Sequence, residues 1–243
     1  HSLILGFFYL NSMKFKYPLE KTKILRRYKR FFADLETSSG DILVAHVPNT
    51  GPMRGAWNEG WICYAMKKEK PKKLTHGAEL TENPEGILIG INTQNPNKII
   101  KEALINNKIK DIKNYKEVIP EQKIGNSKFD FLLKNNDGSD SYLEVKNVSG
   151  EKEKIAFFPD TVSERALKHI NELRDLNKKG IKTNLIFLIQ RSDCSSFRPG
   201  DEYHPEYGIA LREAIKEGVN VLAFSCDVSL TEIKLGKKIK INI

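Results

Sequence analysis

The chain has 243 residues, of which 40% are hydrophobic and 29% are charged, and its formal net charge is +9 at pH 7. This composition is that of a folded protein and excludes an intrinsically disordered chain. The positive charge favours an anionic partner, such as nucleic acid, an anionic membrane surface or a phosphorylated metabolite. Three widely spaced cysteines without a C-x-x-C pair exclude a disulfide framework and a cysteine-based zinc site, and they indicate a cytoplasmic location.

The first twelve residues precede the first methionine, Met13, and contain the longest apolar run, LILGFFYL over residues 3–10. This run is too short to span a bilayer, and no Lys or Arg precedes it as in a secretory signal. We therefore interpret residues 1–12 as a leader or tag, exclude them from the fold, and expect no membrane segment.

Short strand-like runs separated by turns fill residues 13–95. ILVAHV, WICYAMKK and GILIGIN are apolar, whereas SSGD, PNTGPMRG and KKEKPKK between them carry the residues of turns and loops. Several short strands at this spacing predict a small β-barrel or sandwich.

From about residue 96 helical and strand-like patterns alternate. Helices are predicted in 95–109, where Asn95 or Asn97 is the expected cap, and in EYGIALREAIKEG, which ends at Gly218. TNLIFLIQ and VNVLAFSC are continuous apolar runs, which are typical of buried parallel strands, and the tail LTEIKLGKKIKINI predicts a closing hairpin. The alternation predicts a sheet that helices cover on both faces.

The clearest predicted helix lies in FPDTVSERALKHINELRDLNKKG. Thr161 and Glu164 match a capping box, and Gly180 is a stop signal. An apolar stripe follows the helical period. Its members are Val162, Ala166, Ile170 and Leu173.

A hairpin is predicted in residues 127–147, SKFDFLLKNNDGSDSYLEVKN, because NNDG is a turn signal. A turn centred on Asp137 pairs residues whose numbers sum to 274, so Asp130 lies opposite Glu144 with Cβ atoms roughly 5 Å apart. Side chains alternate along a strand, so Glu144 and Lys146 share a face. The opposite, packing face is predicted to hold Phe129, Phe131, Leu143 and Val145.

Two carboxylates this close repel each other unless a cation lies between them. Mg²⁺ or Mn²⁺ held by Asp130 and Glu144 would acidify water and neutralise charge on a scissile phosphate, and Lys146 would orient the water or stabilise the transition state. This is the chemistry of metal-dependent phosphodiester hydrolysis. The alternative is a solvated strand edge, because Glu-x-Lys is common in strands.

The order helix, three strands, helix, strand, with D…E-x-K on the hairpin and a later glutamine, resembles the core of the PD-(D/E)XK nuclease superfamily. Phe129 stands where the motif has proline, which is a tolerated departure. The resemblance implies that Asp130 and Glu144 are metal ligands and Lys146 is the catalytic lysine. It further implies that Glu102 is the helix acid and Gln190 the accessory glutamine.

Several longer stretches resemble the sugar fermentation stimulation protein A family over nearly the whole chain from Met13. They are HVPNTGPMRG, SKFDFLL, YLEVKNV, FPDTVSERALKHINEL and FLIQRSD. The resemblance implies an α+β or α/β fold, with an N-terminal OB-like β-barrel over 13–95 and a nuclease-like α/β/α domain over 96–243. It also implies DNA binding and a role in regulating sugar (maltose) metabolism genes. An active metal-dependent DNA endonuclease or exonuclease is the alternative, and a homodimer is left open.

Basic and aromatic residues alternate in KTKILRRYKRFFAD, a pattern that can neutralise phosphates and stack on exposed bases. A solvated strand edge or a plain turn are the alternatives. On the long helix, His169 is expected to be a packed, hydrogen-bonded side chain, with a phosphate contact as the alternative. The candidate DNA contacts are Arg26, Arg27, Lys29, Arg30, Arg54 and Arg165.

Overall fold

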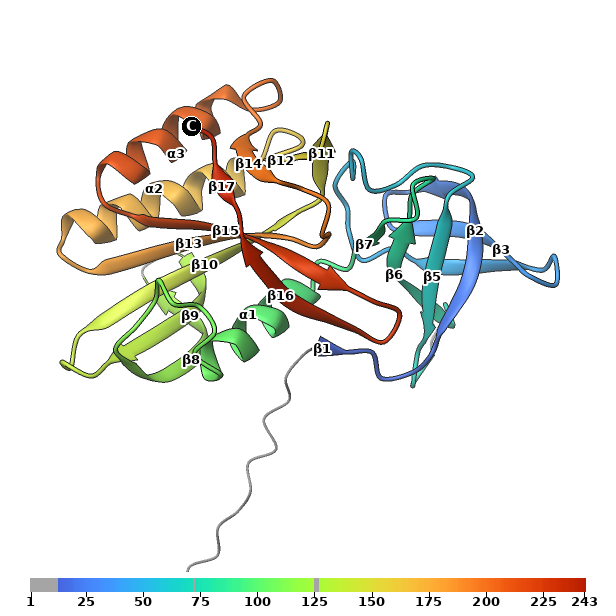
Figure 1. Cartoon of the computed structure of the whole chain (residues 1–243), viewed down its shortest axis with the longest axis horizontal. Coiled ribbons are helices and arrows are strands. Elements are labelled where there is room, and N and C mark those ends of the chain that lie inside the picture. Colours follow the sequence, from blue (N-terminus) through green and yellow to red (C-terminus); the bar gives the residue numbers. More distant parts are fainter. Residues whose placement is uncertain (1–12, 72, 125–126) are drawn as a thin grey trace, which may run out of the picture.

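The computed structural model describes residues 13–71, 73–124 and 127–243. A small all-β unit lies beside a larger unit of strands and helices (Figure 1). The interpretation of residues 1–12 as a leader concerns residues outside the described part of the chain. Within the described residues, no helix is both long enough and apolar enough to cross a membrane.

The small unit is a closed barrel. Its strands are β2 (Leu19–Tyr28), β3 (Phe32–Thr37), β4 (Ile42–His46), β5 (Ile62–Lys67), β6 (His76–Glu82) and β7 (Leu88–Gly90). They are hydrogen-bonded in the order β4-β3-β2-β5-β6-β7, and a parallel pairing of β4 with β6 closes the first five into a ring. This is the five-stranded Greek-key barrel of the OB fold, as predicted.

The interior of the barrel is narrow, and small side chains fill it. Ala33, Ala45, Ala65 and Ala78 are fully buried there, beside larger residues such as Leu35. Side chains close the inside of a barrel of this size, so it forms a packed core and not a channel. Ligands of the barrel must therefore bind on its outer surface.

The larger unit contains a mixed seven-stranded sheet in the order β1-β16-β15-β13-β10-β9-β8. Its strands are β1 (Met13–Lys14), β8 (Tyr115–Ile124), β9 (Ser127–Asn135), β10 (Asp140–Val148), β13 (Lys182–Ile189), β15 (Asn220–Val228) and β16 (Glu232–Lys238). The middle strands β10, β13 and β15 are parallel, and the others pair antiparallel. The prediction that TNLIFLIQ is a central parallel strand is confirmed.

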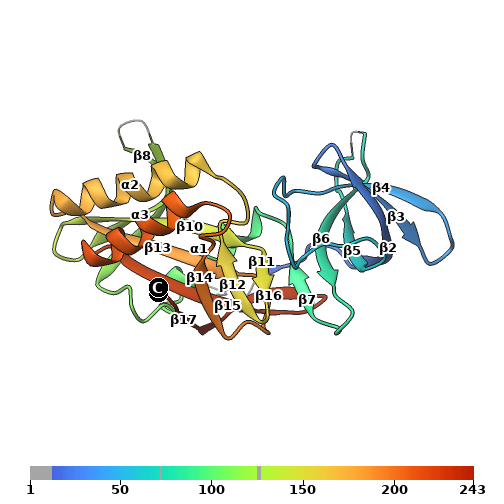
Figure 2. The same ribbon diagram turned by 90° about the horizontal axis from the view of Figure 1, so that it is seen from above.

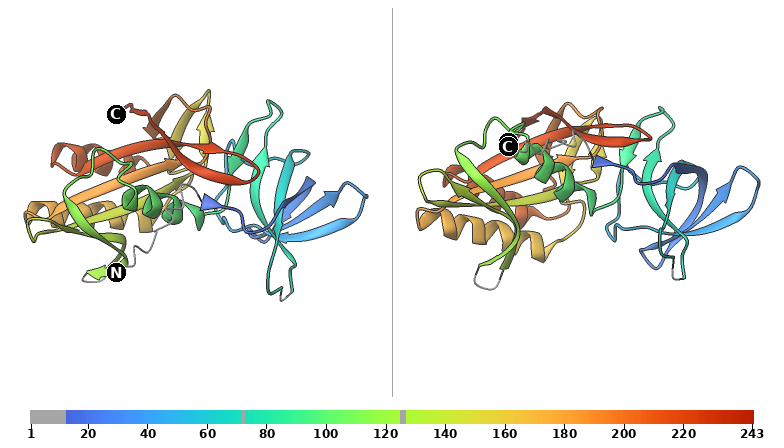
Figure 3. Two further views of the ribbon diagram at one scale, coloured as in Figure 1. Left: turned by 60° about the horizontal axis from the view of Figure 1, so that its bottom comes forward. Right: turned by 90° about the horizontal axis from the view of Figure 1, so that it is seen from below.

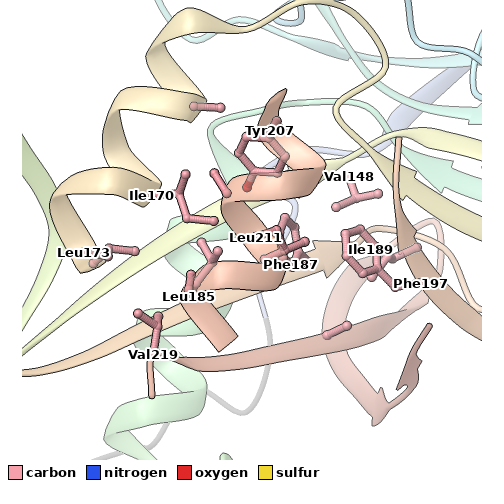
Figure 4. Close-up of a cluster of buried hydrophobic side chains, with 14 of the residues drawn as sticks. Val148, Ile170, Leu173, Leu185, Phe187, Ile189, Phe197, Tyr207, Leu211 and Val219 are labelled. Atoms are coloured by element: carbon pink, nitrogen blue, oxygen red, sulfur yellow. The ribbon is translucent and has the colours of Figure 1, made fainter. Parts of the chain in front are cut away.

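Helices cover both faces of this sheet. Helix α1 (Asn95–Ile105) lies on one face, and helices α2 (Glu164–Lys178) and α3 (Pro205–Lys216) lie on the other (Figures 2 and 3). Strand β13 is apolar on both sides because it packs against both layers. Leu185 and Phe187 pack with Ile170 and Leu211 beneath α2 and α3 (Figure 4), whereas Ile186 belongs to the core beneath α1. The larger unit is the predicted α/β/α domain.

A second, four-stranded sheet in the order β11-β12-β14-β17 completes the larger unit. Its strands are β11 (Gly150–Lys152), β12 (Ile155–Phe158), β14 (Ser196–Pro199) and β17 (Lys240–Ile241). The prediction of a closing hairpin in the tail is therefore wrong: β16 pairs with β15 and β17 pairs with β14. Sequence alternation does not identify the partner of a strand.

Two helix starts differ from the prediction. Helix α2 is capped by Ser163, whose Oγ accepts from the N–H of Ala166 at 3.3 Å, so Thr161 is not the cap and Val162 is 61% exposed. Helix α1 is preceded by Gln94 without a side-chain cap. Asn95 is instead a buried partner of Glu79, and its amide donates to that carboxylate at 3.0 Å.

The barrel contacts the carboxyl end of β13. The N–H of Gly90 donates to the carbonyl of Gln190 at 2.7 Å. A Cβ on Gly90 would lie 2.8 Å from the Cβ of Gln190, so only glycine permits this approach. The next residue, Arg191, is 2% exposed and donates to the carbonyl of Gly55 at 2.7 Å and to both oxygens of Asp193. A buried guanidinium thus joins the two units.

Candidate active site

The hairpin has the predicted register. Pairs from Asp140↔Lys134 to Leu143↔Phe131 all follow the sum of 274. The pairing of β10 with β9 ends at Leu143, one step before Asp130 and Glu144 would face each other. Beyond that point, a side-chain hydrogen bond replaces the backbone pairing: Asp130 Oδ2 accepts from the N–H of Val145 at 2.7 Å.

The Asp130 carboxylate lies between strand β10 and the first turn of helix α1. Its Oδ1 accepts from the Asn97 amide at 2.6 Å. Burial and, to a smaller extent, the nearby charge of Glu144 together raise the pKa of Asp130 to about 6, despite these two hydrogen bonds. The two acids are therefore electrostatically coupled, as two carboxylates near one site must be.

The Glu144 carboxylate is only 4% exposed and has two unlike oxygens. Oε1 accepts from the Lys146 ammonium at 2.6 Å and from the His169 ring at 2.5 Å. Burial opposes the charge of Glu144, but the His169 hydrogen bond and the Lys146 charge outweigh it and lower the pKa. Oε2 is buried and has no hydrogen-bond partner among the described residues.

Strand β13 brings Gln190 to the same end of the sheet. This side chain is 1% exposed, and its amide donates to the Asn147 side-chain oxygen at 2.7 Å and to the Asn92 carbonyl at 3.2 Å. Its Oε1 is also buried without a partner in the described part of the chain. Unpaired buried oxygens are costly, and each one in a folded protein needs an explanation such as a bound ion or water.

These oxygens suit a hard divalent cation. Asp130 and Glu144 supply two carboxylates, and Mg²⁺ typically takes one or two carboxylates and keeps several waters. The described residues contain no group of three or more His, Cys, Asp or Glu side chains placed to hold a metal ion. The described side chains therefore do not surround a metal ion completely. The residues fit a cation that keeps open positions for water and substrate.

The packing face of the hairpin differs from the prediction at one residue. Phe131, Leu143 and Val145 lie in the core beneath α1, but Phe129 lies in the core beneath α2 and α3. The Phe129 ring there lies 6.1 Å from the His169 ring, centroid to centroid. Strand β9 changes face at Asp130, where its pairing with β10 has ended.

Two family models match the chain. The SfsA N-terminal OB domain matches residues 25–91, and the sugar fermentation stimulation protein RE domain matches residues 94–232. The chain belongs to the sugar fermentation stimulation protein family. The resemblance seen in the sequence is thereby confirmed.

Relatives in this family match the chain along most of its length. A sugar fermentation stimulation protein homolog of Rippkaea orientalis is 42% identical and covers 90% of this chain and 93% of its own. One of Bdellovibrio bacteriovorus is 39% identical and covers 93% of this chain and 98% of its own. A solved structure of Pyrococcus furiosus SfsA in complex with Ca²⁺ shares the fold, with 24% identity, a TM-score of 0.86, and coverage of 96% and 100%.

In this family member, Glu102 lies away from the paired acids. It lines a small recess with Met13 and Ile233 beside strands β1 and β16, and burial raises its pKa. The side of α1 toward Asp130 carries Asn97 and Lys101 instead. This corrects the expectation that Glu102 joins the two acids. Five residues separate Glu102 from Asn97, which turns them to different sides of the helix.

His169 was expected to be packed, and it is. It lies in α2 under Phe129 and donates to the very carboxylate that the sequence singled out. Its role at Glu144 could not be read from the helix pattern, which showed only a histidine at the border of an apolar stripe. Asn97 was missed for a similar reason, since it was interpreted as a helix cap.

The basic residues of the barrel divide into two kinds. Arg26 pairs with Asp34 at 2.6 Å and lies over the Tyr28 ring. Arg27 is half-buried and donates to the carbonyls of Asn49 and Gly51, so it holds the following loop in place. Lys29 and Arg30 lie in the tight turn between β2 and β3 with positive φ, and both are exposed.

A cleft of about 670 Å³ lies between this turn and the segment that precedes α2. Arg30 and Trp57 line it from the barrel, and Thr161 and Val162 line it from the larger unit. Arg165 is exposed on the first turn of α2. Arg54 stacks over the Tyr203 ring at 4.7 Å and donates to the Asp160 carbonyl at 3.2 Å, so it also fastens the two units together.

Proposed function

We propose that this protein binds DNA and hydrolyses phosphodiester bonds with Mg²⁺ or Mn²⁺ held by Asp130 and Glu144. One observation carries the proposal: the buried Glu144 Oε2 is unpartnered, next to a coupled acid and a lysine. Lys146 and His169 offset the charge of Glu144, whereas burial and the charge of Glu144 keep the pKa of Asp130 raised, so a cation that offsets the charge of Asp130 would stabilise the pair. The Ca²⁺ complex of the archaeal family member agrees with a divalent site in this fold.

Each protein group has a distinct role in this proposal. A divalent cation at the two acids supplies positive charge that withdraws electrons from the phosphate and acidifies water. Lys146 places its ammonium beside Glu144 and stabilises the negative charge that develops on the phosphate oxygens. His169 holds Glu144 Oε1, which leaves Oε2 available for the cation. Gln190 offers its unpartnered Oε1 to water or substrate at the same end of the sheet.

The proposed DNA surface is the exposed turn of the barrel and the adjoining cleft. Lys29, Arg30 and Arg165 are exposed and close to this cleft or its rim, so they can pair with phosphates. Arg26, Arg27 and Arg54 already have partners in the protein, and we propose for them a supporting role in the same surface. The net charge of +9 favours the encounter with DNA.

Cleavage of plasmid DNA and of labelled single-stranded and double-stranded oligonucleotides tests the proposal. Incubation with Mg²⁺ or Mn²⁺ should cut at least one substrate, and Glu144→Gln or Lys146→Met should lower the rate at least a hundredfold. Asp140→Asn is the matched control, because Asp140 is a carboxylate on the same strand that pairs with Lys134. Cutting that persists in Glu144→Gln would show a contaminating nuclease and overturn the assignment.

The second candidate is a DNA-binding regulator of sugar (maltose) metabolism that does not cut. The names of the relatives and the basic barrel favour it. The proposed setting is the cytoplasm, where three buried, unpaired cysteines stay reduced. A reporter for maltose genes in cells that carry Glu144→Gln separates the candidates. Unchanged regulation would mean that the acid pair is not needed for it.

A further inference from the structure

Residues at the starts of β13 and β15 line a cavity of about 540 Å³. In Figure 1 these strand ends lie at the end of the large sheet that is farthest from the barrel. The cavity lies where β13 and β15 begin and where β9 turns into β10. The candidate active site lies near the opposite ends of β10 and β13. Six residues of β13 separate Asn184 in the cavity from Gln190, which is roughly 20 Å along an extended strand.

Four neighbouring strands place polar side chains on this cavity. They are Asn135 on β9, Ser141 on β10, Asn184 on β13 and Asn220 on β15. Asn135, Ser141 and Asn184 are more than nine-tenths buried. Apolar residues of the core beneath α1 occupy the next positions on the same strands, such as Leu133 and Ile186. The sheet thus switches from an apolar to a polar floor at the cavity.

Most of the polar groups of this floor hydrogen-bond with one another. Ser141 donates to Asn135, and Asn220 donates to Asn184 at 2.9 Å. Asn184 in turn donates to the carbonyl of Tyr142. The network fixes the amides and hydroxyls in place, so they form a prearranged surface for a polar ligand.

One group remains unpaired. Thr183 lines the cavity, is 2% exposed, and its Oγ1 has no hydrogen-bond partner among the described residues. A buried hydroxyl without a partner costs free energy that valine, of the same shape, would avoid. Thr183 shares the face of Leu185, toward α2, whereas Asn184 shares the face of Ile186, toward α1, so this hydroxyl lies across the strand from the amides of the floor. A ligand hydroxyl that reaches this side of the cavity would satisfy it.

Three lysines surround the polar floor. Lys110, Lys113 and Lys182 line the cavity, and none of them forms an ion pair within the described ranges of the chain. The acid in the cavity, Asp111, is already paired with Lys238 at 2.5 Å. The cavity therefore has an excess of positive charge, and lysine is a common binder of phosphate.

We propose that this cavity binds the phosphomonoester of a small molecule that carries several hydroxyl groups, of which a sugar phosphate is the source we favour. The lysines match the phosphate, and the amides and hydroxyls of the floor match ligand hydroxyls, since each can donate or accept. The volume lies in the range of ligand sites, roughly 300–1,000 Å³. The described lining contains no aromatic ring on which a nucleotide base could stack, which favours a sugar phosphate over a mononucleotide.

Isothermal titration and thermal melting of the full chain test this proposal with glucose 6-phosphate, glucose, inorganic phosphate and AMP. Glucose 6-phosphate should bind at least tenfold more tightly than glucose or inorganic phosphate alone and should raise the melting temperature. Lys113→Gln and Lys182→Gln should each lower the affinity for glucose 6-phosphate about tenfold, because each removes one phosphate contact. Lys116→Gln, an exposed lysine on β8 outside the cavity, makes the same charge change and should have no effect.

Thr183→Val separates the hydroxyl contact from the charge. The substitution should weaken the binding of glucose 6-phosphate severalfold and leave the binding of inorganic phosphate unchanged. Equal binding of phosphate and glucose 6-phosphate, insensitive to Thr183→Val, would overturn the proposal. Tighter binding of AMP than of glucose 6-phosphate would overturn the assignment of a sugar phosphate as the ligand. If none of the small molecules binds and Lys113→Gln lowers the affinity for DNA, the cavity is part of the DNA surface. This result would also overturn the proposal.

Discussion

The two ends of the central strands handle buried polar groups in different ways. At the end that faces the barrel, charged groups lie beside neutral ones such as Gln190: Glu144 and Arg191 are buried, and Asp130 and Lys146 are half-buried. At the far end, the deeply buried groups are neutral amides and hydroxyls, and the lysines stay at the rim. The difference agrees with the two proposals, in which the first end carries out chemistry and the second recognises a ligand. Charges inside a protein can shift electrons and protons, whereas a neutral floor can only select the shape and hydrogen bonds of a ligand.

The comparison also shows how the barrel contributes. Arg191 satisfies Asp193 and lies 3.4 Å from Glu151, while it donates to the barrel carbonyl of Gly55. Charged groups at this end are therefore held partly by the neighbouring unit. Among the described residues, the larger unit alone lines the cavity at the far end, and its polar groups bind one another instead.

The largest effect should come from breaking the charged junction. We expect Arg191→Leu to lower the free energy of unfolding by about 3–5 kcal/mol, because it leaves buried carboxylate partners without a counter-charge. Urea unfolding followed by circular dichroism measures this. Arg212→Leu is the control: the side chain of its partner Asp201 is 44% exposed, so the expected loss is at most about 1 kcal/mol. Equal losses in the two variants would show that burial at the junction does not matter.

The next effect concerns the pH dependence at Asp130. Since its pKa is raised to about 6, the folded protein keeps a proton that the unfolded chain releases near pH 4. Stability therefore falls as the pH rises from about 4 to about 6, and it stays reduced above that range. Asp130→Asn cannot ionise, so it should gain up to about 3 kcal/mol relative to the wild type between pH 4 and pH 7.5.

Melting curves with a chelator present measure this difference, since a bound cation would offset the same charge. Asp137→Asn is the control, because Asp137 lies in the exposed turn and its pKa is lowered by hydrogen bonds from Ser139. It should lose stability above about pH 4 where Asp130→Asn gains it. A wild type and Asp130→Asn that melt in parallel at every pH would contradict the coupling between the two acids.

The register and the acid pair of the candidate site were readable from the sequence for a physical reason. The turn NNDG fixes the pairing sum, and strand alternation then fixes which face Glu144 and Lys146 share. The prediction from the same alternation was wrong at Phe129, because β9 changes face where its pairing with β10 ends. Strand alternation predicts the face of a side chain only as far as the backbone pairing of the two strands continues.

Contacts between elements far apart in the chain were not readable. His169 and Glu144 are 25 residues apart and meet because α2 packs across β10. Glu102 and Asn97 are close in sequence, but only the crossing of α1 over the sheet decides which one faces Asp130. Helix periodicity shows which residues share a side, not what that side meets. The prediction that the tail forms a closing hairpin was wrong for the same reason.

At the far end of the sheet, Thr183→Val tests whether the polar floor is built for a ligand at the expense of stability. Valine has the shape of threonine and removes the unpaired hydroxyl, so we expect a gain of about 1 kcal/mol without ligand. Ser141→Ala is the contrast, because Ser141 donates to Asn135 and its loss should destabilise. Thermal melting of both variants decides it. A destabilised Thr183→Val would mean that the hydroxyl already has a partner such as water.

The smallest expected effect lies where α2 begins, at the charged end that carries His169. Ser163→Ala removes the side-chain cap of the helix and should cost about 0.5–1 kcal/mol, in the lower part of the range for N-caps because the bond is 3.3 Å long. Thr161→Ala should cost little, since Thr161 is exposed and outside the helix. Fraying of the first turn would also loosen His169 from Glu144, about one and a half turns further along. The cleavage rate of Ser163→Ala should therefore fall slightly while Thr161→Ala stays at the wild-type rate, and the reverse order would restore Thr161 as the cap.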